Sequence, residues 1–377
     1  MLLEWIKSQI ESNGPVTVAR FMEWALYHPE WGYYTRGPQI GPRGDFTTSP
    51  EASTVFGAVL ARHIMEVDTL LERPQSLHIL ECGPGRGTLA RDILESLRNA
   101  APDVYARARY LMLEISPALK QMQETLLGDG YTNRVEWISS LSELTTGIQG
   151  AVIANEFLDA FPVHVLSRQD GELVEQYVDV GQEGELICVY DRISSSHLND
   201  FVQRYGLRLE DGERIEVSLG AAEWLAELST CLERGVACFF DYGDTHPKRF
   251  SEARRAGTLL GYRGGAVTDN PLAHPGEQDL TALVDFTHLS DTAMDAGFDL
   301  LGITRQATFL VGLGLGEGST ATLAHNNVDG ALEYRKGLQA LISMEGLGRF
   351  HVMLLAKGMD PDSTRQGLSG LRFIDIL

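Results

Sequence analysis

Apolar and polar residues follow two different periods through the middle of the chain, between residues 77 and 157. Short apolar runs bounded by polar residues or glycine predict buried strands, and apolar residues spaced three or four apart predict amphipathic helices. In chain order these are a strand at 77–82, a helix at 88–100, a strand at 109–116, a helix at 117–127 and strands at 135–138 and 151–157. The repeated order of strand and helix predicts a parallel, doubly wound α/β sheet.

Helical periodicity dominates before this region, in residues 1–70. It is interrupted at 29–50 by a stretch rich in glycine and proline, whose tryptophan and tyrosine residues favour an ordered lid over disorder. The stretch ends in Thr48, Ser49 and Pro50, which predict a helix start with Ser49 as the N-cap and Pro50 at the first helical position. The alternative for Ser49 is that it only starts this helix and has no role in a binding site.

The pattern changes again after residue 162. The segments VHVLSRQ, ELVEQYVDV and ELICVYD, with an Asp-Gly turn between the first two, predict antiparallel strands. The α/β rhythm returns with a helix around 221–235, and the last strand is expected at 350–358. We therefore predict an N-terminal helical region with the lid loop at 1–70, a core formed by 71–162 and 213–377, and an antiparallel β insertion at 163–212.

A glycine-rich turn follows the first strand of the repeat, with Gly83, Gly85 and Gly87 directly after Glu81 and Cys82. Glycine at every second position lets the backbone approach a ligand closely. The spacing differs from the GxGxxG of nicotinamide-binding folds, and Glu81 would repel a pyrophosphate but attract a cationic cofactor. Glu114 ends the next strand, where a carboxylate can bind ribose hydroxyls. We predict S-adenosyl-L-methionine as the cofactor; a purely structural glycine turn is the alternative.

The residues after the strand at 135–138 bear on the adenine end of such a cofactor. An acidic side chain often contacts the adenine amino group at this position, but the chain has Ser139, Ser140 and Leu141 here. We expect contacts from the backbone or the serines to take its place, with Ser140 and Leu141 beside the cofactor.

Composition and charge narrow the class of protein. The chain has 377 residues, of which 44% are hydrophobic and 22% charged, as in ordinary globular proteins. The net charge of −21 argues against nucleic acid and favours a cationic partner, although acidity that only maintains solubility is the simpler reading. The four cysteines and ten histidines lack metal-ligand spacing, so no metal is expected. With no targeting signal and no apolar run of ~20 residues, we expect a cytoplasmic protein without a membrane span.

Polar residues follow the last strand of the repeat, in the sequence AVIANEFLDAF. Asn155, Glu156 and Asp159 stand there among apolar neighbours, and polar groups beside a core must be paired or functional. Ligands of doubly wound sheets bind at the carboxyl ends of the strands, so we expect these side chains at a ligand site. The alternative is that Glu156 and Asp159 cap a short helix and Asn155 closes a turn.

Several motifs together resemble the MidA family of S-adenosyl-L-methionine-dependent methyltransferases, namely FMEWALYHPEWGYY, GDFTTSPE, ECGPGRGTL, ANEFLDAFPV, DYG and PGEQDLTALVDFT. The resemblance implies a class I methyltransferase fold, a Rossmann-like doubly wound sheet whose last strand is antiparallel, with an N-terminal helical region and β-rich insertions. It also implies that Thr48, Ser49 and Pro50 form a wall of the cofactor site and that His274 lies near the substrate. His274 is therefore a candidate catalytic residue, with a structural histidine in a loop as the alternative.

The resemblance further implies an activity. Eukaryotic members are taken to form symmetric dimethylarginine on a subunit of NADH dehydrogenase during complex I assembly, so we expect a protein substrate with an exposed arginine. A carboxylate that accepts two N–H bonds localises the guanidinium charge and leaves the remaining nitrogen more nucleophilic. We expect Glu156 to be this clamp, with Asn155 beside it and Asp159 as a second carboxylate or proton acceptor.

Two other functions stay open on the sequence. One is a methyltransferase for a small molecule or another side chain, because a fold does not determine its substrate. The other is a non-catalytic assembly factor that binds the cofactor only for stability. The oligomeric state is open as well, with a homodimer among the alternatives.

Overall fold

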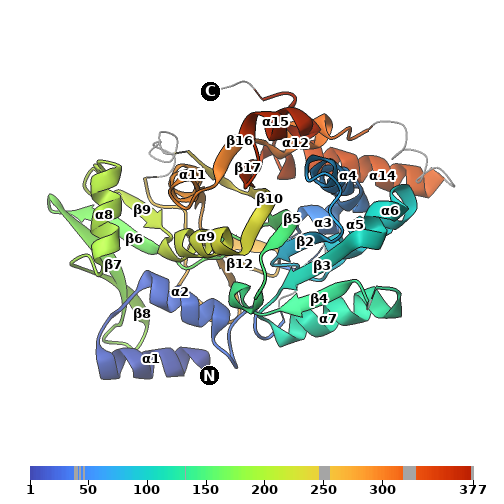
Figure 1. The fold of residues 1–377 in the computed structure, drawn as a ribbon. Helices are drawn as coiled ribbons and strands as arrows, with labels where there is room; N and C mark the ends of the chain where they lie inside the picture. The colour runs from blue at the N-terminus through green and yellow to red at the C-terminus, as the bar shows by residue number, and fades with distance from the viewer. Residues whose placement is uncertain are drawn as a thin grey trace.

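A seven-stranded sheet forms the centre of the protein (Figure 1). The computed structural model describes residues 1–37, 41, 44–45, 47–131, 133–245, 255–316 and 328–374. The strand order is β16-β17-β10-β5-β2-β3-β4; β17 is antiparallel to both of its neighbours, and β10, β5, β2, β3 and β4 are parallel. This confirms the predicted doubly wound sheet with an antiparallel last strand. The strands are β2 (Leu77–Cys82), β3 (Ala108–Leu113), β4 (Val135–Ile138), β5 (Ile148–Asn155), β10 (Leu232–Asp241), β16 (Asp299–Arg305) and β17 (His351–Lys357).

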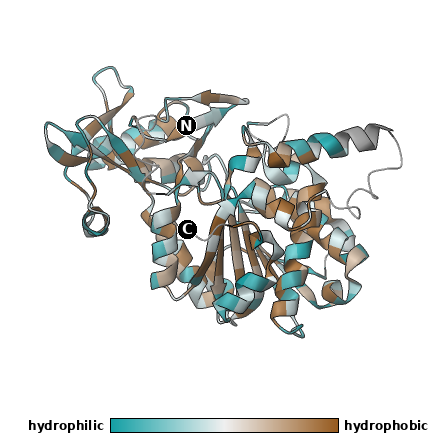
Figure 2. Cartoon of the chain, turned by 90° about the horizontal axis from the view of Figure 1, so that it is seen from above, coloured by the Kyte–Doolittle hydropathy of each residue, from teal (hydrophilic) through white to brown (hydrophobic). Residues whose placement is uncertain are grey.

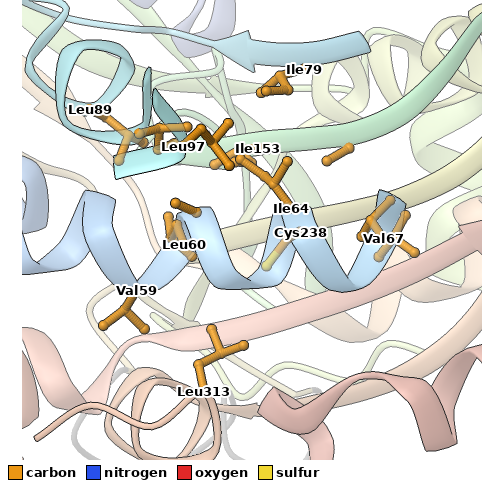
Figure 3. Close-up of a cluster of buried hydrophobic side chains, with 14 of the residues drawn as sticks. Val59, Leu60, Ile64, Val67, Ile79, Leu89, Leu97, Ile153, Cys238 and Leu313 are labelled. Atoms are coloured by element: carbon orange, nitrogen blue, oxygen red, sulfur yellow. The ribbon is translucent and has the colours of Figure 1, made fainter. Parts of the chain in front are cut away.

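Helices cover both faces of this sheet because the strand side chains alternate between them. Ile79 of β2 and Ile153 of β5 belong to a buried cluster with α4 and α5, part of which is drawn in Figure 3. Their neighbours Leu80 and Val152 face the opposite cluster, with α9 and α11. The strands are therefore apolar on both faces, as buried parallel strands require. The helices are α4 (Thr54–Leu70), α5 (Thr88–Ala100), α7 (Pro117–Leu127), α9 (Leu219–Cys231), α11 (Phe286–Asp295), α12 (Gln306–Gly312), α14 (Val328–Ile342) and α15 (Pro361–Gly367).

The N-terminal segment and the β insertion together form a lobe beside the core (Figure 1). Residues 16 and 17, expected in a helix, form a short strand that pairs antiparallel with β7. The insertion sheet has the order β1-β7-β6-β9 with β8 on β7, so it extends past the expected end at residue 212. The elements are α1 (Leu2–Asn13), β1 (Val16–Thr17), α2 (Val18–Tyr27), β6 (His164–Gln169), β7 (Glu172–Val180), β8 (Leu186–Asp191), α8 (Ser196–Arg204) and β9 (Arg214–Val217).

A second insertion forms a small antiparallel sheet of three strands, in a region that the sequence indicated only as irregular. Its order is β13-β12-β14, and β14 pairs with β12 from Leu260 to Tyr262. This sheet brings Asp279, at the start of β14, close to the N-terminal region. Tyr34 Oη donates a hydrogen bond of 2.9 Å to Asp279 Oδ1 there. The strands are β12 (Leu260–Arg263), β13 (Ala266–Thr268) and β14 (Asp279–Thr281).

The aromatic residues of the predicted lid loop pack onto the N-terminal lobe where the structure describes them. Trp31 stacks on His28 with ring centroids 4.7 Å apart, and Tyr34 stacks on Tyr27 at 5.6 Å. Residues 38–40, 42–43 and 46 of this loop lie outside the described residues. The described part of the loop is therefore a packed wall of the lobe.

Hydrophobic residues are concentrated in the strands of the central sheet, between helices with hydrophilic outer faces (Figure 2). Among the described residues, none of the helices combines the length and the apolar character needed to cross a bilayer.

Candidate functional site

A cavity of about 550 Å³ lies at the carboxyl ends of the parallel strands. Its wall includes the glycine turn after β2, Glu114 after β3, residues 139–141 after β4 and residues 155–157 after β5, and Tyr27 of α2 contributes from the N-terminal lobe. Open α/β sheets bind their ligands at this edge, so the cavity is the candidate site.

The glycine turn needs its glycines for both backbone conformation and space. Gly83, Gly85 and Gly87 have φ angles of 66°, 52° and 83°, in the left-handed region that other residues rarely adopt. At Gly83 a Cβ atom would also lie 2.8 Å from the Phe157 ring. The turn therefore presents bare backbone to the cavity before α5 begins at Thr88.

Glu81 lies at the base of the cavity and is only 3% exposed. Tyr110 Oη donates a hydrogen bond of 2.7 Å to its Oε2 atom. Burial, together with the charges of Glu114 and Asp92, raises the pKa of Glu81 to about 7, against the opposing effect of the Tyr110 hydrogen bond. A buried acid surrounded by other acids is suited to a cationic ligand.

Glu114 is held from two sides at the end of β3. Its Oε1 atom accepts a hydrogen bond of 2.8 Å from Ser116 N, and its Oε2 atom accepts one of 3.0 Å from Gln123 Nε2. Burial raises the pKa of Glu114 to about 7 against these bonds. The carboxylate is thus oriented before any ligand arrives.

Gln123 is a positioning residue that the sequence analysis missed. It is completely buried; besides Glu114, its Nε2 atom donates to Gly85 O at 2.7 Å, and its Oε1 atom accepts from Trp137 Nε1 at 2.8 Å. One side chain therefore connects the glycine turn, Glu114 and β4. The available signal was a polar residue on the inward face of the helix at 117–127.

Gln123→Leu is expected to lower the free energy of unfolding by about 2 kcal/mol, because it leaves buried polar partners without a hydrogen bond. It should also weaken binding of the predicted cofactor by roughly tenfold, since Glu114 loses its orientation. Denaturant unfolding and calorimetry measure the two effects. Gln121→Leu, on the exposed face of the same helix, is the matched control and should change neither. A fully stable Gln123→Leu protein with normal binding would contradict the assignment.

Thr48 and Pro50 reach the cavity, Ser49 lies buried behind them, and the helix cap differs from the expected one. Helix α3 (Ser49–Ala52) begins at Ser49, so Thr48 is the N-cap residue, and it makes no side-chain capping bond. Ser49 is buried; its N–H donates to Glu156 Oε1 at 3.3 Å and its hydroxyl donates to Gln306 Oε1 at 3.0 Å. Thr48 and Pro50 line the cavity directly.

Ser140 and Leu141 line the same cavity as Glu114, at the far end of β4. Ser140 caps a short 3₁₀ helix (Leu141–Glu143), and the Glu143 carboxylate accepts hydrogen bonds from Ser139 N and Ser140 N. The serine side chain is therefore used in the turn, which leaves backbone and the Leu141 side chain for the cavity.

Glu156 has an unusual backbone conformation at the end of β5, with a φ angle of 52°. Such angles are uncommon outside glycine and often mark functional sites. Its Oε1 atom accepts a hydrogen bond of 3.0 Å from Asn155 Nδ2. Burial raises the pKa of Glu156 to about 8, and the charges of Asp159 and Asp279 contribute to this shift.

Asp241 holds the turn that follows Glu156. Its Oδ2 atom accepts hydrogen bonds from the backbone N–H groups of residues 157, 158 and 159, at 3.3, 2.9 and 3.3 Å. One alternative from the sequence was that Glu156 and Asp159 cap a short helix. In the structure Asp241, at the end of β10, accepts the backbone N–H bonds of this segment instead. Neither of those two carboxylates is used to close a helix.

Glu156 also borders a second, smaller chamber of about 180 Å³. Asp159, Tyr242, Asp279 and Arg349 line this chamber, and Tyr34 and Glu156 line both spaces. Burial raises the pKa of Asp159 to about 6, opposed by a hydrogen bond with the Tyr242 side chain. Asp159 follows β5, whereas Asp279 comes to the chamber on β14, from a distant part of the chain.

His274 is not brought to the site. It is exposed, has a φ angle of 49° and lies in a turn where its carbonyl oxygen accepts a hydrogen bond of 2.9 Å from Glu277 N. Neither chamber has His274 in its described wall. Its turn allows Gly276 to pack against the Trp31 backbone. A position of His274 near a bound substrate stays a prediction.

The residues of the larger cavity fit a cofactor with a cationic end. Glu81, Glu114 and Glu156 all line it, and the pKa of each is raised by burial. Buried carboxylates without a counter-charge are unfavourable in their ionised form, and a bound cation relieves this cost. In the described part of the chain, no group of three His, Cys, Asp or Glu side chains is arranged to hold a metal ion.

Sequence comparison places the chain among known proteins. Residues 59–304 match the family described as S-adenosyl-L-methionine-dependent methyltransferase. The Danio rerio protein named Protein arginine methyltransferase NDUFAF7, mitochondrial, is 29% identical over 92% of this chain and 84% of its own length. The Drosophila melanogaster homologue, also named as mitochondrial, is 32% identical over 77% of this chain and 70% of its own. These relatives contradict the expected cytoplasmic localisation, which is wrong by this comparison.

Solved structures agree with the fold and the cofactor. A crystal structure from Burkholderia thailandensis bound to S-adenosyl-homocysteine has a TM-score of 0.85 and 30% identity, and the match covers 95% of this chain and 92% of that one. A native crystal structure from the same organism has a TM-score of 0.86 and 28% identity, with 99% and 94% covered. The predicted fold and cofactor are therefore confirmed, and the chain belongs to the family of S-adenosyl-L-methionine-dependent methyltransferases.

Proposed function

We propose that this methyltransferase acts on arginine side chains of a protein substrate. The observation that carries the proposal is the group of three buried or partly buried carboxylates beside the cofactor cavity, formed by Glu156, Asp159 and Asp279. The charges that raise the pKa values of Glu156 and Asp279 are those of other acids. Such a chamber favours a cationic acceptor, and a guanidinium keeps its charge throughout the physiological pH range. The names of the relatives from Danio rerio and Drosophila melanogaster support the same acceptor.

In this proposal the larger cavity holds the cofactor. S-adenosyl-L-methionine supplies an electrophilic methyl group on a sulfonium when it is bound. Glu81 would bind the cationic amino-acid end, and Glu114 the ribose hydroxyls. The backbone of the glycine turn (Gly83, Gly85, Gly87) would approach the cofactor closely, with Ser140 and Leu141 at the adenine and Thr48, Ser49 and Pro50 as a side wall.

The acceptor side of the mechanism rests on Glu156. Its carboxylate would accept two N–H bonds from the guanidinium, fixing its plane and making the remaining nitrogen more nucleophilic. Asn155, bonded to Glu156 Oε1 at 3.0 Å, would hold the carboxylate in this orientation. Asp159, with a pKa raised to about 6, would accept the proton that the nitrogen loses when it is methylated.

We infer that the protein substrate carries an exposed arginine on a basic surface, and that a subunit of NADH dehydrogenase is the first to test. The net charge of −21 favours association with a cationic partner. Formation of symmetric dimethylarginine is part of the same proposal.

The test is methylation of arginine-containing and lysine-containing peptides by the purified protein, with isotopically labelled cofactor and mass spectrometry of the products. We expect label on arginine alone, and acid hydrolysis of the product should release symmetric dimethylarginine. Label on another side chain or on a small molecule would overturn the acceptor assignment. Binding of S-adenosyl-L-methionine without transfer to any acceptor would support the non-catalytic assembly factor instead.

A further inference from the structure

Asp279 is a buried carboxylate that none of the steps above uses. It is 2% exposed, at the start of β14, and Tyr34 Oη donates a hydrogen bond of 2.9 Å to its Oδ1 atom. Burial and the charge of Asp159 raise the pKa of Asp279 to about 8. An ionised carboxylate in this position is unfavourable unless a cation joins it. Glu156, Asp159 and the basic residue Arg349 also line the chamber that contains Asp279. The excess of carboxylates over this one basic residue favours a cationic ligand.

The smaller chamber puts Asp279 and Glu156 around one space. Its volume of about 180 Å³ has room for about six water molecules, which suits a guanidinium-sized group better than a ring system. Tyr34 and Glu156 line both this chamber and the cofactor cavity. A cation bound in the chamber would thus lie next to the cofactor.

Asp159, the other acid of the chamber, has part of its hydrogen-bonding capacity taken up within the protein. The Tyr242 side chain and the backbone N–H of Ala160 both bond to it. Glu156 and Asp279 come from separate elements, the turn after β5 and the strand β14. A guanidinium has N–H groups on three nitrogens in one plane and can bond to both carboxylates, whereas an ammonium is a compact point charge.

We propose that Asp279, oriented by Tyr34, is the specificity-determining residue that selects a guanidinium over an ammonium in this chamber. The inference rests on the proposed function, because it concerns the acceptor side of the same site. Asp279 accepts an N–H bond from a guanidinium nitrogen that Glu156 leaves available. Tyr34 fixes the Asp279 carboxylate and is itself stacked on Tyr27, with an angle of 17° between the rings.

The test is calorimetric binding of two probes, ethylguanidinium and butylammonium, to the full-length protein saturated with S-adenosyl-homocysteine. The wild type is expected to bind ethylguanidinium more tightly, by about tenfold, the value of one additional charged hydrogen bond. Asp279→Asn should lose about that factor for ethylguanidinium and change little for butylammonium. Tyr34→Phe, which removes only the orienting hydroxyl, should lose about threefold.

Glu277→Gln is the matched control, because Glu277 is an exposed acid two residues away that pairs with Arg263 at 2.8 Å. It should leave both affinities unchanged. Equal binding of the two probes, no binding of either to the wild type, or an unchanged affinity in Asp279→Asn would each overturn the inference. If Asp279→Asn does not unfold cooperatively, Tyr34→Phe decides by the same measurement. Selective guanidinium binding without arginine methylation would overturn the proposed function and leave this inference standing.

Discussion

Glu156→Gln is expected to lower kcat for methyl transfer to an arginine peptide by about a thousandfold, the upper range for removal of one preorganised electrostatic group. The substitution keeps the shape of the side chain and its bond with Asn155. The amide NH2 group, however, is a hydrogen-bond donor, so the side chain loses one of the two oxygens that accept N–H bonds from the guanidinium. The guanidinium would lose both its fixed plane and its localised charge. Steady-state kinetics with saturating peptide measure the effect.

The affinity of the same variant for S-adenosyl-homocysteine separates catalysis from cofactor binding. It should stay within about threefold of the wild type, because Glu156 is proposed to contact the acceptor. Glu227→Gln is a suitable control, since Glu227 of α9 also lines the large cavity but is exposed. Wild-type kcat in Glu156→Gln would remove the clamp from the mechanism.

Glu81→Gln is expected to weaken binding of S-adenosyl-L-methionine by about a hundredfold, the upper value for loss of a hydrogen bond between charged groups. In the wild type the affinity should rise with pH up to about 7, because the raised pKa leaves Glu81 partly protonated below that value. Calorimetry between pH 5.5 and pH 8.5 would measure this rise. For each group that must ionise, the affinity should change by roughly tenfold per pH unit below its pKa. Glu81→Gln should show a shallower dependence.

Glu81→Gln weakens cofactor binding, but it should raise the free energy of unfolding of the cofactor-free protein at neutral and higher pH. A carboxyl group whose pKa is about 7 in the native state, against an unfolded value of about 4.5, binds more protons when the protein is folded. Its contribution to stability is therefore lost as the pH rises from about 4.5 to about 7, and Glu81→Gln should escape this loss. Denaturant unfolding at pH 5 and pH 8 tests the sign. Glu136→Gln, an exposed acid on β4, serves as the control.

Local signals account for the parts of the site that could be predicted. The glycine turn, Glu81 and Glu114 were found because a strand, a tight turn and a helix occupy consecutive residues, and the left-handed angles of Gly83, Gly85 and Gly87 require glycine. The helix at 117–127 was predicted with its observed bounds because Pro117 is favoured in the first turn. The sequence alone also indicated that Asn155, Glu156 and Asp159 reach the ligand edge.

Local signals failed where a residue acts through a distant partner. Asp241 has the acidic side chain of a site residue, yet it caps the turn after β5, which depends on the pairing of β5 with β10. His274 stands in a motif of the family, but its left-handed backbone serves a turn. Gln123 lies on the inward face of its helix, which the sequence indicates, but its partners in the network are known only from the structure.

By itself, the sequence determined the α/β class, the alternation of strands and helices along the repeat, and the glycine turn with its two acids, because each depends on periodicity or backbone angles over a few adjacent residues. The tertiary structure alone decided that β1 completes the insertion sheet and that Tyr34 meets Asp279, 245 residues away. The free edge of a strand can pair with any extended segment, and a buried acid can accept a hydrogen bond from any hydroxyl group that the fold places next to it. Those choices are made by the packing of the whole chain, and the second of them places Asp279 and Tyr34 in the wall of the smaller chamber.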